Sequence, residues 1–333
     1  MHISGRTEPY VEFYKTPKHA CGRPKPPPPP RKPSTDYEPS PAAKSVTATV
    51  VLRSKVDDSG IRGIASLDNR LYVLHVRSKD QLDELDVHDL RLQRRLSVPA
   101  ESCSHLADMA SCPRRRRLFI SHDTSNCVHV VTLTAGEVWT KWETDGSPWG
   151  LSVSPGSGNL LVTLRYAACV DEFSAEGRRL RRVDLQRGGV FNPWHAVQLG
   201  IVANEPEVLV VGHGDRDDDA VRVGFVRVLD GGRSSVGERW YAGSAPGTPL
   251  SRPQHLAVGR NGTIVVVDVF NARVVLLDDS LRLAGVLDAF PYDRMAGWRS
   301  SRVCWIGRRL CVAEVKVIEG KFAASRLIIY DLH

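Results

Sequence analysis

Three histidines in this sequence occupy matching places, each directly before the apolar residue that opens a β-like run. They are His105, His195 and His255. Three imidazoles that converge on one point can hold a zinc ion and leave one coordination position open for water or substrate. They meet only if the elements that carry them place these positions around a common axis.

The elements are copies of one unit. An apolar anchor residue recurs at intervals of 42, 45, 45, 60 and 47 residues, and a period of about 40 to 50 is typical of propeller blades. The six anchors are Ile64, Leu106, Leu151, Ala196, Leu256 and Val303. After each anchor come a turn and a second apolar run, then a third, with no helical periodicity. The sequence therefore predicts an all-β, six-bladed β-propeller.

A fourth strand is visible in five of these units, but the sixth reaches His333 before a fourth strand can form. Residues 45–54 precede the first unit and alternate β-branched residues, which favours a strand. We expect this segment to complete the last blade as its outer strand. It would close the ring and cover two sheet edges that would otherwise be open.

One copy carries a resemblance to a known family. Its matching positions are Pro253, His255, Leu256, Ala257, Val258, Gly262, Val267, Asp268, Asn271, Arg273, Val274 and Asp278. Weaker matches lie at 146–155 and 191–199. In these residues the chain resembles the NHL-repeat β-propellers, particularly the C-terminal propeller of invertebrate tripartite-motif-like proteins. The resemblance implies an NHL-type propeller over residues 46–333. No RING, B-box or coiled-coil pattern is seen, so ubiquitin-ligase activity is not implied.

The propeller is preceded by a basic, proline-rich segment, residues 1–45, which we expect to be a disordered tail. Arg23, Pro26 and Pro29 fit one orientation of a ligand for an SH3-type domain, and Pro26, Pro29 and Arg31 fit the other. The alternative interpretation is a stiff linker.

Composition limits the protein class. With 42% hydrophobic and 25% charged residues among 333, the chain can bury a large core. No apolar run is long enough to span a bilayer, and the first residues lack the apolar core of a secretory signal. We therefore expect a cytoplasmic protein. The seven cysteines form no C-x-x-C pair, so neither a zinc finger nor a disulfide framework is indicated.

In a propeller, the first strand of each blade starts at the face that carries the links between blades, here called the connection face. Residues near these starts should surround one mouth of the central channel. The expected binding residues are Arg62, His105, Trp149, Trp194, His195, His255 and Arg302. Aromatic and arginine side chains dominate interface energies, so this mouth is predicted to bind a protein or peptide as a non-catalytic scaffold.

Two alternatives for the histidines stay open. Histidine and aspartate at these positions can hold turns by bonding backbone amides. The second alternative is a metal-dependent lyase or hydrolase that resembles the peptide-amidating lyases. Against it, Arg302 brings a cation to the same ring. The sequence-based prediction is accordingly a protein that is not an enzyme, with no metal and no cofactor.

The opposite face, here called the turn face, carries the links between strands one and two and between strands three and four. Its arginines are Arg114, Arg115, Arg116, Arg117, Arg178, Arg179, Arg181 and Arg182. They predict an alternative function, the binding of RNA through its phosphates. The other interpretation is a solvated surface. Acidic runs at 79–86 and 214–220 predict an acidic connection face.

Overall fold

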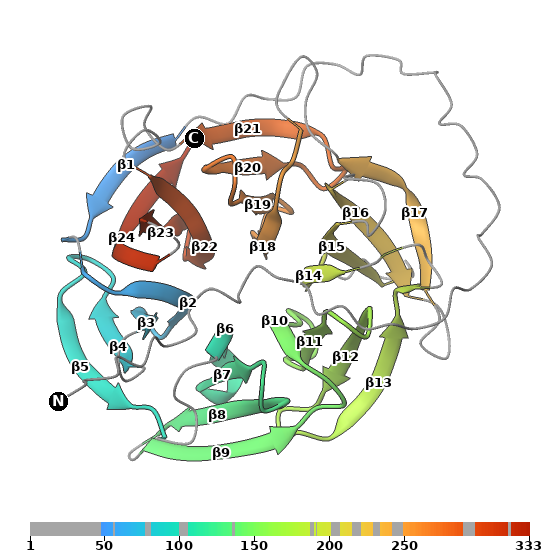
Figure 1. The fold of residues 1–333 in the computed structure, drawn as a ribbon, viewed down its shortest axis with the longest axis horizontal. Helices are drawn as coiled ribbons and strands as arrows, with labels where there is room; N and C mark the ends of the chain where they lie inside the picture. The colour runs from blue at the N-terminus through green and yellow to red at the C-terminus, as the bar shows by residue number, and fades with distance from the viewer. Residues whose placement is uncertain are drawn as a thin grey trace, which may run out of the picture.

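Runs of apolar and β-branched residues, ended by turns, form six four-stranded antiparallel sheets around one axis (Figure 1). This arrangement, a six-bladed β-propeller, is seen in a computed structural model. The model describes residues 48–55, 57–76, 81–99, 106–134, 137–186, 190, 192–200, 207–214, 221–228, 234–241, 249–288, 297–318 and 321–333.

Each blade runs from an inner to an outer strand. Blade one has β2 (Gly60–Leu67), β3 (Arg70–Val76), β4 (Gln81–Asp86) and β5 (Leu92–Ser97). Blade two has β6 (Leu106–Cys112), β7 (Arg117–His122), β8 (Cys127–Leu133) and β9 (Glu137–Glu143). Blade three has β10 (Pro148–Val153), β11 (Leu160–Leu164), β12 (Cys169–Phe173) and β13 (Arg179–Asp184).

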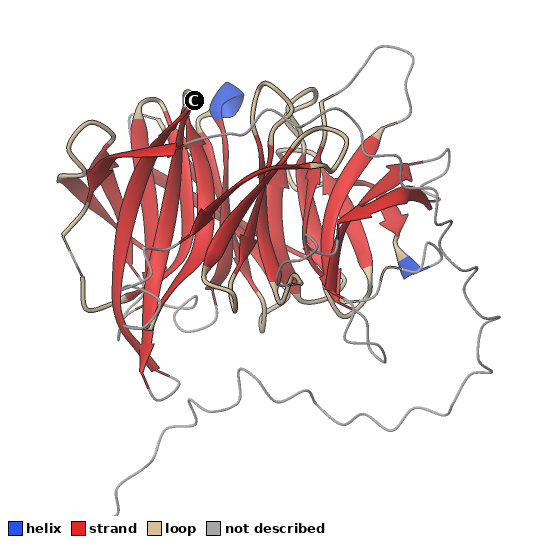
Figure 2. Cartoon of the chain, turned by 90° about the horizontal axis from the view of Figure 1, so that it is seen from above, coloured by secondary structure: helices blue, strands red, loops and turns tan. Residues whose placement is uncertain are grey.

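The second half of the ring repeats this order. Blade four has β14 (Pro193–Gln198), β15 (Val208–Gly214), β16 (Val221–Val228) and β17 (Ser234–Tyr241). Blade five has β18 (Pro253–Val258), β19 (Ile264–Asp268), β20 (Arg273–Leu277) and β21 (Leu283–Asp288). Blade six has β22 (Trp298–Ile306), β23 (Arg309–Ile318), β24 (Lys321–Leu332) and, as its outer strand, β1 (Ala48–Arg53). Seen from the side in Figure 2, the strands run between the two faces.

The ring is closed as the sequence predicts. Strand β1 pairs antiparallel with β24, and Ala48 faces Leu332 while Arg53 faces Ile328. The first and last parts of the described chain therefore share one sheet. The all-β, six-bladed architecture with an N-terminal closing strand is confirmed. The predicted tail and its SH3-type ligand, residues 1–45, lie outside the described residues.

A variant of β1 tests this closure. Leu52 packs against the core between blades six and one, whereas Val51 sits at a bulge and is 39% exposed. Leu52→Asp is expected to lower the free energy of unfolding by about 2 kcal/mol, because a charge would replace packed apolar surface. The matched variant Val51→Asp should change it by less than about 0.5 kcal/mol. If β1 did not close the ring, denaturant melts would show equally small losses of stability in both variants.

In every blade the pairing between the inner strand and the second strand shifts in register at the same place, near the start of the inner strand. One residue of the inner strand has no partner in the second strand there. An extra residue in one strand bends it and changes the direction of its side chains. The six residues that follow this shift are Gly63, Asp108, Gly150, His195, His255 and Arg302. We call them the axial ring.

Apolar side chains of adjacent blades fill the space between them. One cluster joins Ile64 and Leu71 of blade one to Ile329 of blade six, and another joins Leu74 to Leu118 of blade two. These contacts hold the inner strands rigidly, which fixes the axial ring.

Among the described residues the 3-10 helix Pro113–Arg115 is much too short to cross a bilayer, and no helix there is long and apolar enough to do so.

Candidate functional site

The axial ring brings four chemically active side chains together, in blades two, four, five and six. They are Asp108, His195, His255 and Arg302. Two of the three predicted histidines are present, but the place in blade two belongs to Asp108. His105 lies outside the described residues. The blade-two anchor is therefore Met109, three residues after the position that the apolar pattern indicates.

Asp108 lies at the centre of this group and is 1% exposed. Its Oδ2 accepts a hydrogen bond from the Leu151 backbone N–H at 2.9 Å. His195 Nε2 lies 3.3 Å from Oδ2, and His255 Nε2 lies 3.3 Å from Oδ1. The two imidazole rings are neighbours, with centroids 4.3 Å apart. One carboxylate is thus shared by two buried imidazoles.

Arg302 completes the group from blade six. Its Nε lies 3.3 Å from Asp108 Oδ1. Its terminal nitrogens donate to the backbone oxygens of Ser301 at 2.8 Å and Ala107 at 2.7 Å. These two contacts fix the guanidinium group between blade six and blade two. It supplies the positive charge that a buried carboxylate needs.

Burial and mutual contact set the charges. Burial alone would raise the pKa of Asp108, but the neighbouring imidazoles and Arg302 outweigh it and hold this pKa well below its usual range. Burial lowers the pKa of His255 to about 4, despite the attraction of Asp108. Asp108 is therefore ionised and His255 neutral at pH 7.

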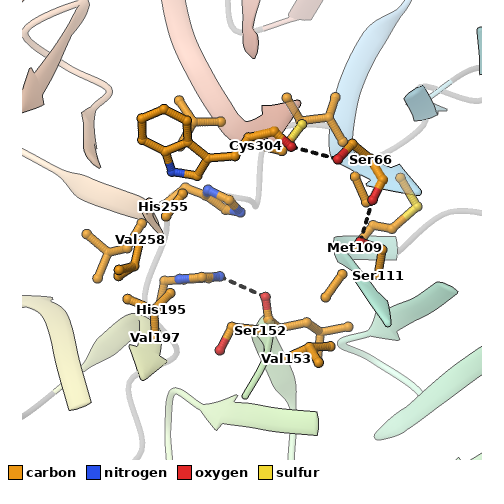
Figure 3. A pocket seen from close by; sticks show the side chains of 18 of the residues that line it. Ser66, Met109, Ser111, Ser152, Val153, His195, Val197, His255, Val258 and Cys304 are labelled. Atoms are coloured by element: carbon orange, nitrogen blue, oxygen red, sulfur yellow. Dashed lines mark hydrogen bonds between the residues drawn. The ribbon is translucent and has the colours of Figure 1, made fainter. Parts of the chain in front are cut away.

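A pocket of about 190 Å³ starts at the two histidines. Figure 3 shows both imidazoles projecting into it, with Ser152 next to His195 and with Ser66 and Met109 on the opposite side of the pocket. Its other lining residues follow the axial ring along the inner strands, so it extends toward the turn face. The serines hold the blades together around it, as where Ser152 Oγ donates to Ala196 O at 2.8 Å. A small molecule entering here would meet the histidines.

The glycines of the axial ring make room for these side chains. A Cβ on Gly150 would lie 2.6 Å from both Trp194 O and His195 Cδ2. Gly150→Ala is expected to lower the free energy of unfolding by about 1 to 3 kcal/mol and to displace His195. Gly146→Ala is the control, since nothing lies within 4 Å of its Cβ position. Equal thermal stability of the two variants would contradict this packing.

A second ring of residues, at the ends of the second strands, has a structural role. It consists of His75, His122, Leu164, His213, Asp268 and Glu314, each opposite the residue before the register shift. Asp268 accepts hydrogen bonds from the backbone N–H groups of Ser251 and Arg252 at 2.9 and 3.0 Å. His122 Nδ1 accepts one from Ser125 at 3.1 Å. These contacts hold turns, as one alternative from the sequence predicts.

Five of the predicted mouth residues have described contacts, and these fall into two groups. His195, His255 and Arg302 meet at the axis, whereas Trp149 and Trp194 point elsewhere and contact Arg165 on the connection face. Arg62 is half-buried in β2. Trp194 and His195 are adjacent in sequence but contact different groups, because the register shift lies between them. Binding of a partner through the predicted mouth residues stays a prediction.

The turn-face arginines make ion pairs and backbone contacts within the propeller. Arg182 Nε lies 2.6 Å from Asp171 Oδ1, and Arg116 Nε lies 2.7 Å from Asp68 Oδ2. Arg115 pairs with Glu176, Arg179 with Asp145, and Arg181 with Glu172 and Glu207. Arg114 donates to the backbone oxygen of Gly156 at 2.7 Å, and Arg117 to that of Ala175 at 2.5 Å. Arg178 contacts Ser174 through its backbone, since its N–H donates to Ser174 Oγ and its carbonyl oxygen accepts from the Ser174 N–H. RNA binding through these side chains stays a prediction.

The predicted acidic connection face is also not seen in its described part. Asp83 and Glu84 are buried in β4, where Arg95 and Arg94 pair with them at 2.9 and 2.6 Å. The alternating strand buries these carboxylates between neighbouring strands instead of directing them to the mouth. Residues 79–80 and 215–220 lie outside the described residues.

Comparison with known proteins identifies the fold. No family model matches the chain, and no curated protein matches it, so the NHL resemblance and the tripartite-motif likeness are not shown. A streptogramin B lyase structure aligns with a TM-score of 0.54 at 13% identity, over 88% of this chain and 100% of that one. Virginiamycin B lyase from Staphylococcus aureus aligns with a TM-score of 0.53 at 11% identity, over 86% and 99%. Hydrazine synthase of Kuenenia stuttgartiensis aligns with a TM-score of 0.54 at 13% identity, over 86% and 98%.

These findings correct one expectation from the sequence. The chain shares its six-bladed fold with solved lyases. At its axis, ligand atoms of Asp108, His195 and His255 lie within 4.8 Å of one another. The prediction of a protein that is not an enzyme is therefore contradicted. The sequence analysis missed Asp108. In blade two this residue occupies the position that the histidine of the Pro-x-His pattern occupies in blades four and five.

Proposed function

We propose that the chain is a divalent-metal-dependent lyase or hydrolase whose active site is the axial group Asp108, His195 and His255. One observation carries this proposal. Three potential ligand atoms from three blades lie within 4.8 Å of one another, and two of these residues, His195 and His255, line a pocket. A carboxylate and two neutral imidazoles form a common ligand set of catalytic metal sites.

The distances support a small cation. Ligand bonds of about 2.0 to 2.1 Å in a tetrahedral site place the ligand atoms about 3.3 to 3.4 Å apart. The histidine Nε2 atoms each lie 3.3 Å from an oxygen of Asp108. His195 would exchange its 2.9 Å contact with Leu151 O for the cation. The low pKa of His255 keeps that imidazole in the neutral form that binds metal.

Two features should make this site bind a cation more weakly than a site built from three histidines would. Arg302 already neutralises Asp108 and repels a second cation. The Nδ1 atoms of His195 and His255 have no hydrogen-bond partner among the described residues, so no second contact fixes the imidazole tautomers. We expect reversible binding from solution.

The chemistry follows from the residues around the pocket. A bound divalent cation would supply Lewis acidity and lower the pKa of a coordinated water. His195 and His255 would present it to the pocket, and Arg302 keeps Asp108 ionised. The pocket volume of about 190 Å³ admits a small molecule or one end of a larger one. Serine hydroxyls and apolar side chains line it, which supports a substrate of mixed polarity.

Metal titration tests the proposal. The chelator-treated protein is titrated with Zn²⁺ and Mn²⁺ in a calorimeter, and we expect one cation per chain. His255→Ala should abolish binding, whereas His88→Ala should not, because His88 is exposed in the turn after β4. Absence of binding in the unaltered protein, or equal binding by His255→Ala, would exclude this function.

A second candidate function concerns the connection face. Phe270 is 49% exposed there, and Arg252 and Arg299 lie 5.2 and 5.6 Å from its ring. Exposed aromatic and arginine side chains favour the binding of a protein or peptide. Such binding is compatible with an enzyme, since the axial pocket extends the other way.

A further inference from the structure

Arg165 has an unusual environment on the connection face. It lies in the turn between β11 and β12, and its guanidinium carbon is 5.0 Å from the Trp149 ring centroid. Tyr166 and Trp194 are 5.6 and 6.0 Å away. Trp149 and Arg165 come from blade three, and Trp194 comes from blade four. Three aromatic rings from two blades thus surround one cation.

This cation has no carboxylate partner among the described residues. Arg165 Nε is buried without a hydrogen-bond acceptor there, and so is Trp194 Nε1. Burial also lowers the pKa of Arg165. Buried donors are normally paired, and an unpaired buried cation is costly. By contrast, the turn-face arginines described above have carboxylates or carbonyl oxygens beside them.

The aromatic group is open to a ligand. Tyr166 is 60% exposed and Trp149 is half-buried, so the group reaches the surface of the connection face. The guanidinium groups of Arg252 and Arg299 beside Phe270 stand on the same face.

We propose that Arg165, Trp194, Trp149 and Tyr166 form a binding site for a single carboxylate group attached to an aromatic or apolar body. The terminal nitrogens of the Arg165 guanidinium offer two parallel donors to the two oxygens of a carboxylate. One cation balances one carboxylate, whereas a doubly charged phosphate would need more positive charge. The aromatic rings would pack against the body of the ligand. Peptide C-termini and small aromatic acids have this chemistry.

The site is independent of the axial metal group. Its residues lie on the connection face, whereas the axial pocket extends toward the turn face. A test of this carboxylate site is therefore independent of a test of the proposed enzymatic function.

Hippurate, an aromatic acyl glycine, is the probe, and its neutral amide is the control ligand. Both are titrated into chelator-treated protein while tryptophan fluorescence and heat are recorded. We expect hippurate to bind at one site per chain and the amide at least tenfold more weakly. Phenyl phosphate should also bind more weakly than hippurate. His255→Ala should bind hippurate as the unaltered protein does, because the axial ring takes no part.

Two variants assign the site. Arg165→Met should weaken hippurate binding at least tenfold without lowering the melting temperature, because it removes an unpaired cation. Trp149→Ala removes the half-buried ring nearest to the guanidinium, and a loss of about fivefold in hippurate affinity is expected. Arg91→Met is the control, since the Arg91 side chain is 82% exposed elsewhere. No hippurate binding, equal binding of the amide, or undiminished binding by Arg165→Met would overturn the proposal. A lower melting temperature of Arg165→Met would assign the cation a structural partner instead.

Discussion

Asp108→Asn is expected to abolish divalent-cation binding and to lower the free energy of unfolding by about 3 to 5 kcal/mol. The carboxylate is the one anion of the axial group, and Arg302 beside it is 6% exposed. An amide would leave the guanidinium buried without a counter-ion and would remove the anionic metal ligand. Denaturant melts and calorimetric titration with Zn²⁺ measure the two effects.

The control for this variant is Asp89→Asn. Asp89 pairs with Arg91 at 3.3 Å in an exposed turn, where ion pairs contribute little. It should bind Zn²⁺ as the unaltered protein does, with a stability change under about 1 kcal/mol. If Asp108→Asn were as stable as Asp89→Asn, the carboxylate would not be the counter-ion of Arg302.

Arg302→Met should act on the two properties in opposite directions. Without metal, Asp108 loses its cation, so we expect the free energy of unfolding to fall by about 3 to 5 kcal/mol. With metal, the repulsion is gone, and the affinity for Zn²⁺ should rise roughly tenfold or more. Saturating Zn²⁺ should then restore most of the lost stability. Melts with and without Zn²⁺ measure both effects.

The double variant Asp108→Asn/Arg302→Met separates pairing from packing. If the two charges neutralise each other, the double variant should be clearly more stable than the sum of the single losses predicts. Arg309→Met is the matched control, because Arg309 pairs with Asp331 on the exposed side of the same blade at 2.9 Å. Additive losses, or lower Zn²⁺ affinity in Arg302→Met, would contradict the electrostatic account.

The architecture could be predicted from the sequence because each blade repeats one pattern of apolar runs and turns. Residues 45–54 were the one strand-like segment that belonged to none of the six repeat units. This indicated the closure that β1 makes with β24. The second ring could be predicted as well, since His213 and Asp268 directly end apolar second strands.

The axial ring could be predicted only in part. The patterns Pro193-Trp-His195 and Pro253-Gln-His255 repeat in sequence, so these histidines align. Blade two has Leu106 where blades three, four and five have proline, and an apolar anchor was assigned to it. The register shift that places Asp108 at the axis depends on strand pairing, which composition does not reveal. The partners of the arginines were missed for the same reason, because they come from other strands.

The central claim is that Asp108, His195 and His255 hold a divalent cation, and anomalous X-ray diffraction from crystals soaked in Zn²⁺ tests it directly. We predict one anomalous peak about 2.0 to 2.2 Å from a carboxylate oxygen of Asp108 and from an imidazole nitrogen of each histidine. No peak at the axis, with Arg302 still paired to Asp108 and Zn²⁺ bound only at other sites, would contradict the account.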